Sequence, residues 1–321
     1  MLLWRFAVRI FSASAIVLTA SVACGQGYPS KPIRIVTAEP GGGSDFAARL
    51  IAQGLTGSLG QQVVVDNRGG SVVIAAGIVA KAPPDGYTVL LYSGTFWMVP
   101  LLQKVPYDPV KDFAPITLAV SSPVILVVNP SVAAGSVKEL IALAKAGPGE
   151  LNYGSAGPGS PAQMAAELFK AMAGINIVAV PYKGGGPAIT ALIGVQVQLM
   201  FPSAGSVISH VKSGRLRALA VTSAQPSALL PGLPTVAASG LPDYETATLF
   251  GMFAPAATPA ALINQLNHEI VRVLNRAEVK ERLFNANVEV VGNSPKQFAV
   301  AMKSEMTKWS KVIKDAGIRA E

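Results

Sequence analysis

Side chains able to do covalent or acid–base chemistry are scarce in this chain. Of its 321 residues only two are histidines, His210 and His268, and only one is a cysteine, Cys24. Neither histidine has a serine, a thiol or a second metal ligand at a useful spacing, and no GxSxG motif is present. The sequence therefore favours a protein that is not an enzyme and that uses neither a cofactor nor a metal.

Glycines gather instead in three short loops, each between a predicted strand and a predicted helix. They read PGGGSD at 40–45, GSAGPGS at 154–160 and KGGG at 183–186. The first turn of a helix leaves backbone N–H groups unpaired at the positive end of its dipole, and glycine lets a ligand come close to them. None of the loops matches a nucleotide-binding signature, so we expect a carboxylate ligand. Asp45 has two interpretations: it complements the helix dipole, or it contacts the ligand through water.

The elements that must position these loops alternate along the chain. The patterns predict strands at 32–36, 62–65, 87–92, 124–128, 151–153, 177–180, 196–201 and 216–221. They predict helices at 46–59, 74–82, 136–146, 161–173 and 188–193, and two further helices beginning near 259 and 295. Alternation of this kind predicts an α/β fold with mainly parallel sheets flanked by helices, in which ligands bind at the carboxyl ends of strands.

The middle of the chain repeats the alternation by itself. We expect a first lobe formed by 28–128 plus 250–321 and a second lobe formed by 129–249. The chain would cross between the lobes twice, which would leave a cleft between them.

The first residues have the pattern of a secretory signal peptide over 1–23. Arg5 and Arg9 precede an apolar stretch that ends in small residues and is too short to span a membrane. The pattern predicts export to the periplasm. Two interpretations of Cys24 stay open: a lipidated cysteine that anchors the protein, or an incidental residue near the cleavage point.

Charge excludes one class of partner. The formal net charge is +8, and removing Arg5 and Arg9 leaves about +6, but the basic residues are dispersed. An exported chain without a basic cluster is not expected to bind nucleic acid, whereas a mild positive field favours small anions.

Ordered motifs across nearly the whole chain resemble one family, the extracytoplasmic solute receptors of tripartite tricarboxylate transporters, also called the Bug family. The motifs are YPSKPIRIV, PGGGSDFAARLIA, LGQQVVVDNR, PDGYTVLL, YDPVKDFAPIT, ELIALAKAGPGELNYGSAGPGS, VPYKGGGPAITALIG, GRLRALAVTS, LPTVAASG and FAPAATP. The resemblance implies a type II-like periplasmic binding protein whose two lobes close on a small carboxylate and deliver it to a membrane permease. We expect it to act as a monomer.

The resemblance also implies a binding site made largely of main-chain amides. Carried over by position, the site residues are Gly41, Gly42, Gly43, Ser44, Asp45, Ser93, Thr95, Ser155, Gly157, Gly159, Ser160, Lys183, Gly184 and Gly185. This chain departs from the family where Gln163 replaces a common histidine and Val99 a common asparagine. These departures favour a ligand less polar than citrate. Trp97 would either stack on an aromatic acid or lie buried.

Two alternatives to transport remain at this point. An exported enzyme could act on an anion in the same cleft, and it would need a nucleophile with a base in reach. A ligand-presenting receptor for a membrane sensor would use the same clamp with another partner.

Overall fold

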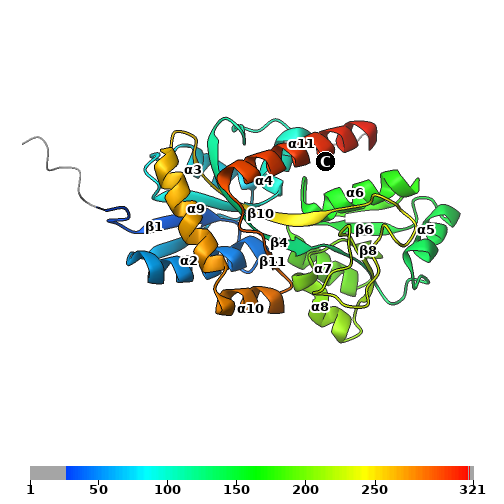
Figure 1. The fold of residues 1–321 in the computed structure, drawn as a ribbon. Coiled ribbons are helices and arrows are strands. Elements are labelled where there is room, and N and C mark those ends of the chain that lie inside the picture. The colour runs from blue at the N-terminus through cyan, green and yellow to red at the C-terminus, as the bar shows by residue number, and fades with distance from the viewer. Residues whose placement is uncertain (1–26, 317, 319–321) are drawn as a thin grey trace, which may run out of the picture.

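The computed structural model describes residues 27–316 and 318, and the predicted signal peptide and Cys24 lie outside them. One sheet has six strands in the order β11-β4-β10-β3-β1-β2 (Figure 1). Their bounds are β1 (Ile33–Thr37), β2 (Val63–Asn67), β3 (Thr88–Ser93), β4 (Phe113–Pro123), β10 (Ala247–Pro255) and β11 (Glu289–Val290).

A second sheet has five strands in the order β7-β6-β8-β5-β9. Their bounds are β5 (Ile125–Val128), β6 (Asn152–Ser155), β7 (Val178–Pro181), β8 (Leu199–Met200) and β9 (Arg217–Val221). The chain passes from β4 directly into β5, and it returns from β9 to β10. The assignment of lobes to 28–128 plus 250–321 and to 129–249 stays a prediction.

The predicted α/β class is confirmed, but both sheets are mixed rather than mainly parallel. In the first sheet β1 pairs in parallel with β2 and β3, whereas β10 runs antiparallel to both β3 and β4. In the second sheet β5 runs antiparallel to its neighbours β8 and β9. The antiparallel pairs arise where the chain crosses between the sheets, because a strand that enters or leaves a sheet at the crossing is not joined to its neighbour by a helical crossover.

Helices cover both faces of the first sheet because its strands alternate their apolar side chains. Ile33, Ile35 and Leu91 join a core with α2 and α9, whereas Val36 and Leu90 face the side of α3, α4 and α11. The helix bounds here are α2 (Gly43–Leu59), α3 (Val72–Ala80), α4 (Thr95–Leu102), α9 (Ala260–Leu274), α10 (Ala277–Asn285) and α11 (Pro295–Ala316).

The second sheet carries α5 (Val137–Ala146), α6 (Pro161–Ala173), α7 (Gly185–Ile193) and α8 (Ala204–Lys212). Helix α11 packs on β4 and α4 of the first sheet and also touches α6 of the second (Figure 1). One buried core therefore continues from one sheet to the other through Trp309, Met164 and Phe169. Within 27–316, no helix combines the length and the apolar character that a membrane crossing requires.

Candidate ligand-binding site

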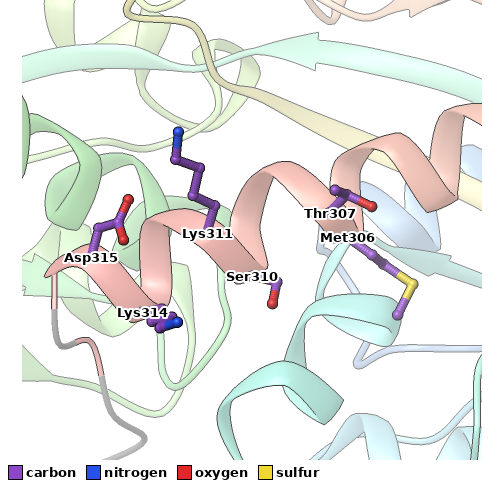
Figure 2. Close-up of a pocket in the computed structure, with 6 residues that line it drawn as sticks. All are labelled: Met306, Thr307, Ser310, Lys311, Lys314 and Asp315. Atoms are coloured by element: carbon purple, nitrogen blue, oxygen red, sulfur yellow. The ribbon is translucent and has the colours of Figure 1, made fainter.

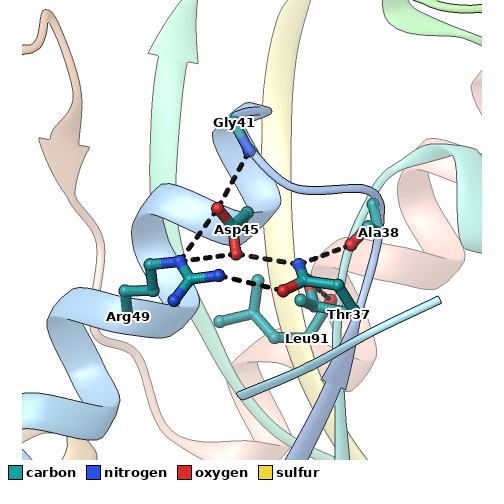
Figure 3. A network of polar contacts seen from close by, with 7 residues as sticks. Thr37, Ala38, Gly41, Asp45, Arg49 and Leu91 are labelled. Carbon is teal, nitrogen blue, oxygen red and sulfur yellow. Dashed lines mark hydrogen bonds and ion pairs between the residues drawn. The ribbon is translucent and has the colours of Figure 1, made fainter. Parts of the chain in front are cut away.

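The loop between β1 and α2 is held by Asp45, whose side chain is only 7% exposed (Figure 3). Its carboxylate accepts hydrogen bonds from the backbone N–H of Gly41 at 2.9 Å and from Nδ2 of Asn67 at 2.8 Å. Nε of Arg49 lies 3.0 and 2.9 Å from the two carboxylate oxygens. Asn67 also donates to the backbone oxygen of Ala38 at 2.8 Å. The carboxylate thus fixes the loop from inside.

These contacts set the charge of Asp45. Burial raises the pKa of this carboxyl group, but the hydrogen bonds from Arg49, Gly41 and Asn67 outweigh burial and hold the pKa below its ordinary value of 3.8. Asp45 is therefore an anion at neutral pH. The structure adds a third role for Asp45, an internal brace of the loop, and the two interpretations from the sequence stay predictions.

The amides that follow the brace are the donors left in this loop. Helix α2 begins at Gly43, and its N-cap, Gly42, provides no side-chain hydrogen bond. Among the described residues, the backbone N–H groups of Gly43, Ser44 and Asp45 have no partner outside the helix. A Cβ added at Gly43 would lie 2.7 Å from Cζ of Phe250 in β10, so this glycine lets the loop approach that ring.

The loop after β3 and the first loop both lie against strand β10. The backbone N–H of Gly94 donates to the backbone oxygen of Leu249 at 2.8 Å, and Ser93 pairs with Phe250 across the sheet. Oγ of Ser93 lies 3.0 Å from Oγ1 of Thr95, the first residue of α4. Both loops of the first sheet therefore lie against Phe250 of β10, and the second loop is also bonded to Leu249.

The loop after β6 repeats the design of the first loop. Oε1 of Gln163 accepts a hydrogen bond from the backbone N–H of Gly159 at 2.8 Å, and Oγ of Ser160 caps α6 through the N–H of Gln163 at 3.2 Å. Oγ of Ser155 accepts from Gly157 at 3.3 Å. As with Asp45 and Gly41, a buried side chain four residues after a glycine takes the N–H of that glycine.

The loop after β7 leads into α7 without a side-chain cap. Gly184 has a φ of 107°, and its backbone N–H donates to Tyr182 at 2.9 Å. The N–H groups of Gly185 and Gly186 have no partner outside α7 among the described residues. Lys183 is exposed and forms no ion pair with any of the described residues.

Contacts join the four segments into a ring. A Cβ at Gly159 would lie 3.0 Å from Cγ2 of Val99 in α4, so the second-sheet loop packs on a first-sheet helix. A Cβ at Gly157 would lie 3.9 Å from the backbone oxygen of Tyr182. A Cβ at Gly184 would lie 3.7 Å from Oε1 of Glu39, which returns to the first loop. The predicted site residues are thus brought together from both sheets.

Two hollows lie near α11. A broad one of about 490 Å³ is lined only by residues of that helix, Met306 to Asp315 (Figure 2), and holds none of the predicted site residues. A second, of about 30 Å³, is lined by Gly94 and Gly159 together with Trp97, Met164 and Trp309. It lies where the ring meets the core, and it is too small for a ligand larger than water.

Some residues of the ring and its surroundings were not singled out by the sequence patterns. Asn67 and Gln163 hold the loops through hydrogen bonds. For Gln163 the sequence offers a signal that was not used, a glycine followed four residues later by a carboxylate or amide side chain. Glu39 lies at the ring although no role was predicted for it. Trp97 is 1% exposed and packs at an angle against Phe253 and Phe298, which agrees with the buried interpretation.

Comparison with known proteins places the chain in one group. Residues 47–318 match the family model described as "Tripartite tricarboxylate transporter family receptor". Protein BugT of Bordetella pertussis is 35% identical over 317 residues, which cover 97% of each chain. The structure of a R. palustris protein with adipate superposes with a TM-score of 0.86 at 36% identity, covering 91% of this chain and 99% of that one. The periplasmic binding protein BugD superposes with a TM-score of 0.83 at 32% identity, covering 92% and 100%.

The family-model match includes strands of both sheets and the loops after β3, β6 and β7, and it begins just after the first loop. The predicted periplasmic binding protein fold and the predicted resemblance are confirmed. The chain belongs to the family of tripartite tricarboxylate transporter receptors, which are solute-binding proteins.

Proposed function

We propose that this protein captures a small carboxylate between its two lobes and delivers it to the membrane permease of a tripartite tricarboxylate transporter. Members of its family are periplasmic binding proteins. The proposal adds that this chain is itself exported, that it works as a monomer, and that its sites are the residues predicted from the sequence. Cys24 directly follows the predicted signal peptide, where lipidation of its thiol would anchor the mature protein to a membrane.

One observation carries the proposal: unpaired amides at helix N-termini belong to loops that lie close together and come from both sheets. The first turns of α2 and α7 lack side-chain caps. Each such turn carries partial positive charge and free donors, which suits a carboxylate better than a neutral group. Because Gly159 lies against Val99 of α4 and Gly184 lies near Glu39 of the first loop, a ligand held there would contact both lobes. Closure would then be favoured by ligand binding.

Binding rather than catalysis fits the side chains at the ring. Asp45 is committed to Gly41, Asn67 and Arg49, so it is not placed to act as a general base. Ser155 is 2% exposed, and its Oγ is used by Gly157. We therefore propose that the protein is not an enzyme.

Thermal unfolding with a panel of carboxylates tests the proposal. Adipate enters the panel because a relative was solved with it; citrate, malate, benzoate and amino acids widen it. The matched control for adipate is 1,6-hexanediol, which keeps the carbon chain and lacks both charges. A ligand at about 100 times its Kd should stabilise the native state by about 2.7 kcal/mol. A panel in which no carboxylate raises the melting temperature above its neutral control would overturn the proposal.

A further inference from the structure

Glu39 brings a negative charge to a ring of anion-binding amides. It follows β1 directly and precedes Pro40 and the glycines of the first loop. Asp45, the other acid of that loop, is paired with Arg49, whereas Glu39 has no ion pair or side-chain hydrogen bond within residues 27–316. A carboxylate without a direct partner thus lies where the proposed ligand is itself an anion.

The exposed side chain of Glu39 lies between the loop after β2 and the loop after β7. Its Oε1 would be 3.7 Å from a Cβ at Gly184, and its own Cβ would be 3.1 Å from a Cβ at Gly69. Burial raises the pKa of the Tyr92 hydroxyl, and the nearby charge of Glu39 raises it further. Among the described residues that hydroxyl forms no hydrogen bond. The carboxylate and the phenol thus lie near each other at the rim of the ring.

A fixed carboxylate at this position discriminates between ligands. A second carboxylate of a ligand is repelled near Glu39, whereas an ammonium group is attracted and can donate hydrogen bonds to it. Because Glu39 is exposed, water and salt weaken both effects without reversing them. The free amides of α2 and α7 remain available to one ligand carboxylate.

We propose that Glu39 is a specificity-determining residue that selects carboxylates carrying an ammonium group, as amino acids do, over the same carboxylates without it. This inference rests on the proposed carboxylate-binding function and names the ligand class of that site. Lys183 precedes Gly184 and could itself pair with Glu39, but the two form no ion pair within 4.0 Å in the described residues.

Three ligand pairs that differ only by the amino group test the inference. They are aspartate and succinate, leucine and 4-methylpentanoate, and phenylalanine and 3-phenylpropionate. Dissociation constants are measured by calorimetry for the wild type, Glu39→Gln, Glu39→Ala and the control Glu281→Gln, which neutralises an exposed acid of α10. Thermal unfolding without ligand checks that each variant folds.

In at least one pair the wild type should bind the amino acid about tenfold more tightly than its partner. Glu39→Gln and Glu39→Ala should lower that ratio about tenfold, and Glu281→Gln should leave it unchanged. An unchanged ratio in both Glu39 variants overturns the inference, as does a wild type that binds carboxylates of the wider panel but no amino acid of the three pairs. If Glu39→Ala lowers the affinity for both members of a pair equally, Glu39 serves the Lys183 loop or closure instead, and the inference is again wrong. Failure of every carboxylate to bind the wild type would count against the proposed function itself.

Discussion

Neutralising Asp45 should loosen the first loop and destabilise the whole protein. In Asp45→Asn the shape is kept, but one acceptor oxygen becomes an NH₂ group that faces donors. In the wild type the Asp45 carboxylate accepts hydrogen bonds from the N–H of Gly41 and from Nδ2 of Asn67, and the side chain is 7% exposed. Hydrogen bonds to a charged acceptor contribute about 1.5–3 kcal/mol each, and the amide can keep one of them.

The contribution of Arg49 is small by comparison. Its side chain is 57% exposed, so the ion pair with Asp45 is screened and contributes at most about 1 kcal/mol. The expected loss in Asp45→Asn is therefore about 2–3 kcal/mol in the free energy of unfolding, which corresponds to a fall of about 3–5 °C in melting temperature for a chain of this length.

The stabilisation that Asp45 contributes should depend on pH. The pKa of Asp45 is lowered in the folded protein relative to 3.8, so the carboxylate contributes its stabilisation above that value and loses it as the pH falls through the lower folded pKa. The difference in melting temperature between the wild type and Asp45→Asn should be constant from about pH 5 to 8 and should narrow below about pH 4.

Differential scanning calorimetry over this pH range is the assay, with Glu281→Gln as the control. The control should melt within about 1 °C of the wild type, since exposed charges away from partners contribute little. A melting difference for Asp45→Asn that is as small as the control, or that persists unchanged down to pH 3, would refute the bracing role.

Two glycine pairs give further predictions. Gly43→Ala should lower stability by about 1–3 kcal/mol and weaken carboxylate binding, because the new Cβ would lie 2.7 Å from the Phe250 ring. In the same helix Gly57→Ala meets nothing within 4 Å and should be stabilising by about 0.5–1 kcal/mol, as urea unfolding can show. Gly159→Ala and Gly174→Ala both place a side chain at positive φ, 67° and 61°, and each should cost about 1–2 kcal/mol of stability. Only Gly159→Ala also pushes against Val99, so only this variant should weaken binding, about fivefold by calorimetry; equal binding by the two variants would contradict the contact across the sheets.

Helix starts with side-chain caps were predicted well from the sequence because their chemistry is local. Helix α6 has the predicted bounds of 161–173, with Ser160 as its cap and Pro161 at its first position. Helix α5 begins after Ser136, whose Oγ accepts from the N–H of Glu139 at 3.2 Å. Where glycines form the first turn this signal is missing, so α2 and α7 begin three residues earlier than predicted, at Gly43 and Gly185.

The mixed sheets could not be predicted because antiparallel pairing is decided by distant segments. Strand β4 contains Pro115 and ends at Pro123, which hides a strand of 11 residues from a pattern-based prediction. Its partner β10 comes more than 120 residues later and was not predicted as a strand either. Helix α4 was missed for a similar local reason, since Pro100 lies inside it. Pairing across the crossing overrides these weak local signals.

The glycine loops were predicted to converge, but the sequence did not reveal which glycines serve the ligand and which serve the fold. Gly43 and Gly159 leave room for Phe250 and for α4, and the amides of Gly41 and Gly159 are taken by Asp45 and Gln163. The donors left for a ligand are therefore the amides of the first three residues of α2, Gly43 to Asp45, and those of the first two residues of α7, Gly185 and Gly186. A site of this kind draws its affinity from backbone groups, so discrimination among carboxylates must come from the few side chains at the rim. Of the charged side chains at the ring, Glu39 and Lys183 have no ion pair among the described residues, and Glu39 is the one that can attract an ammonium group.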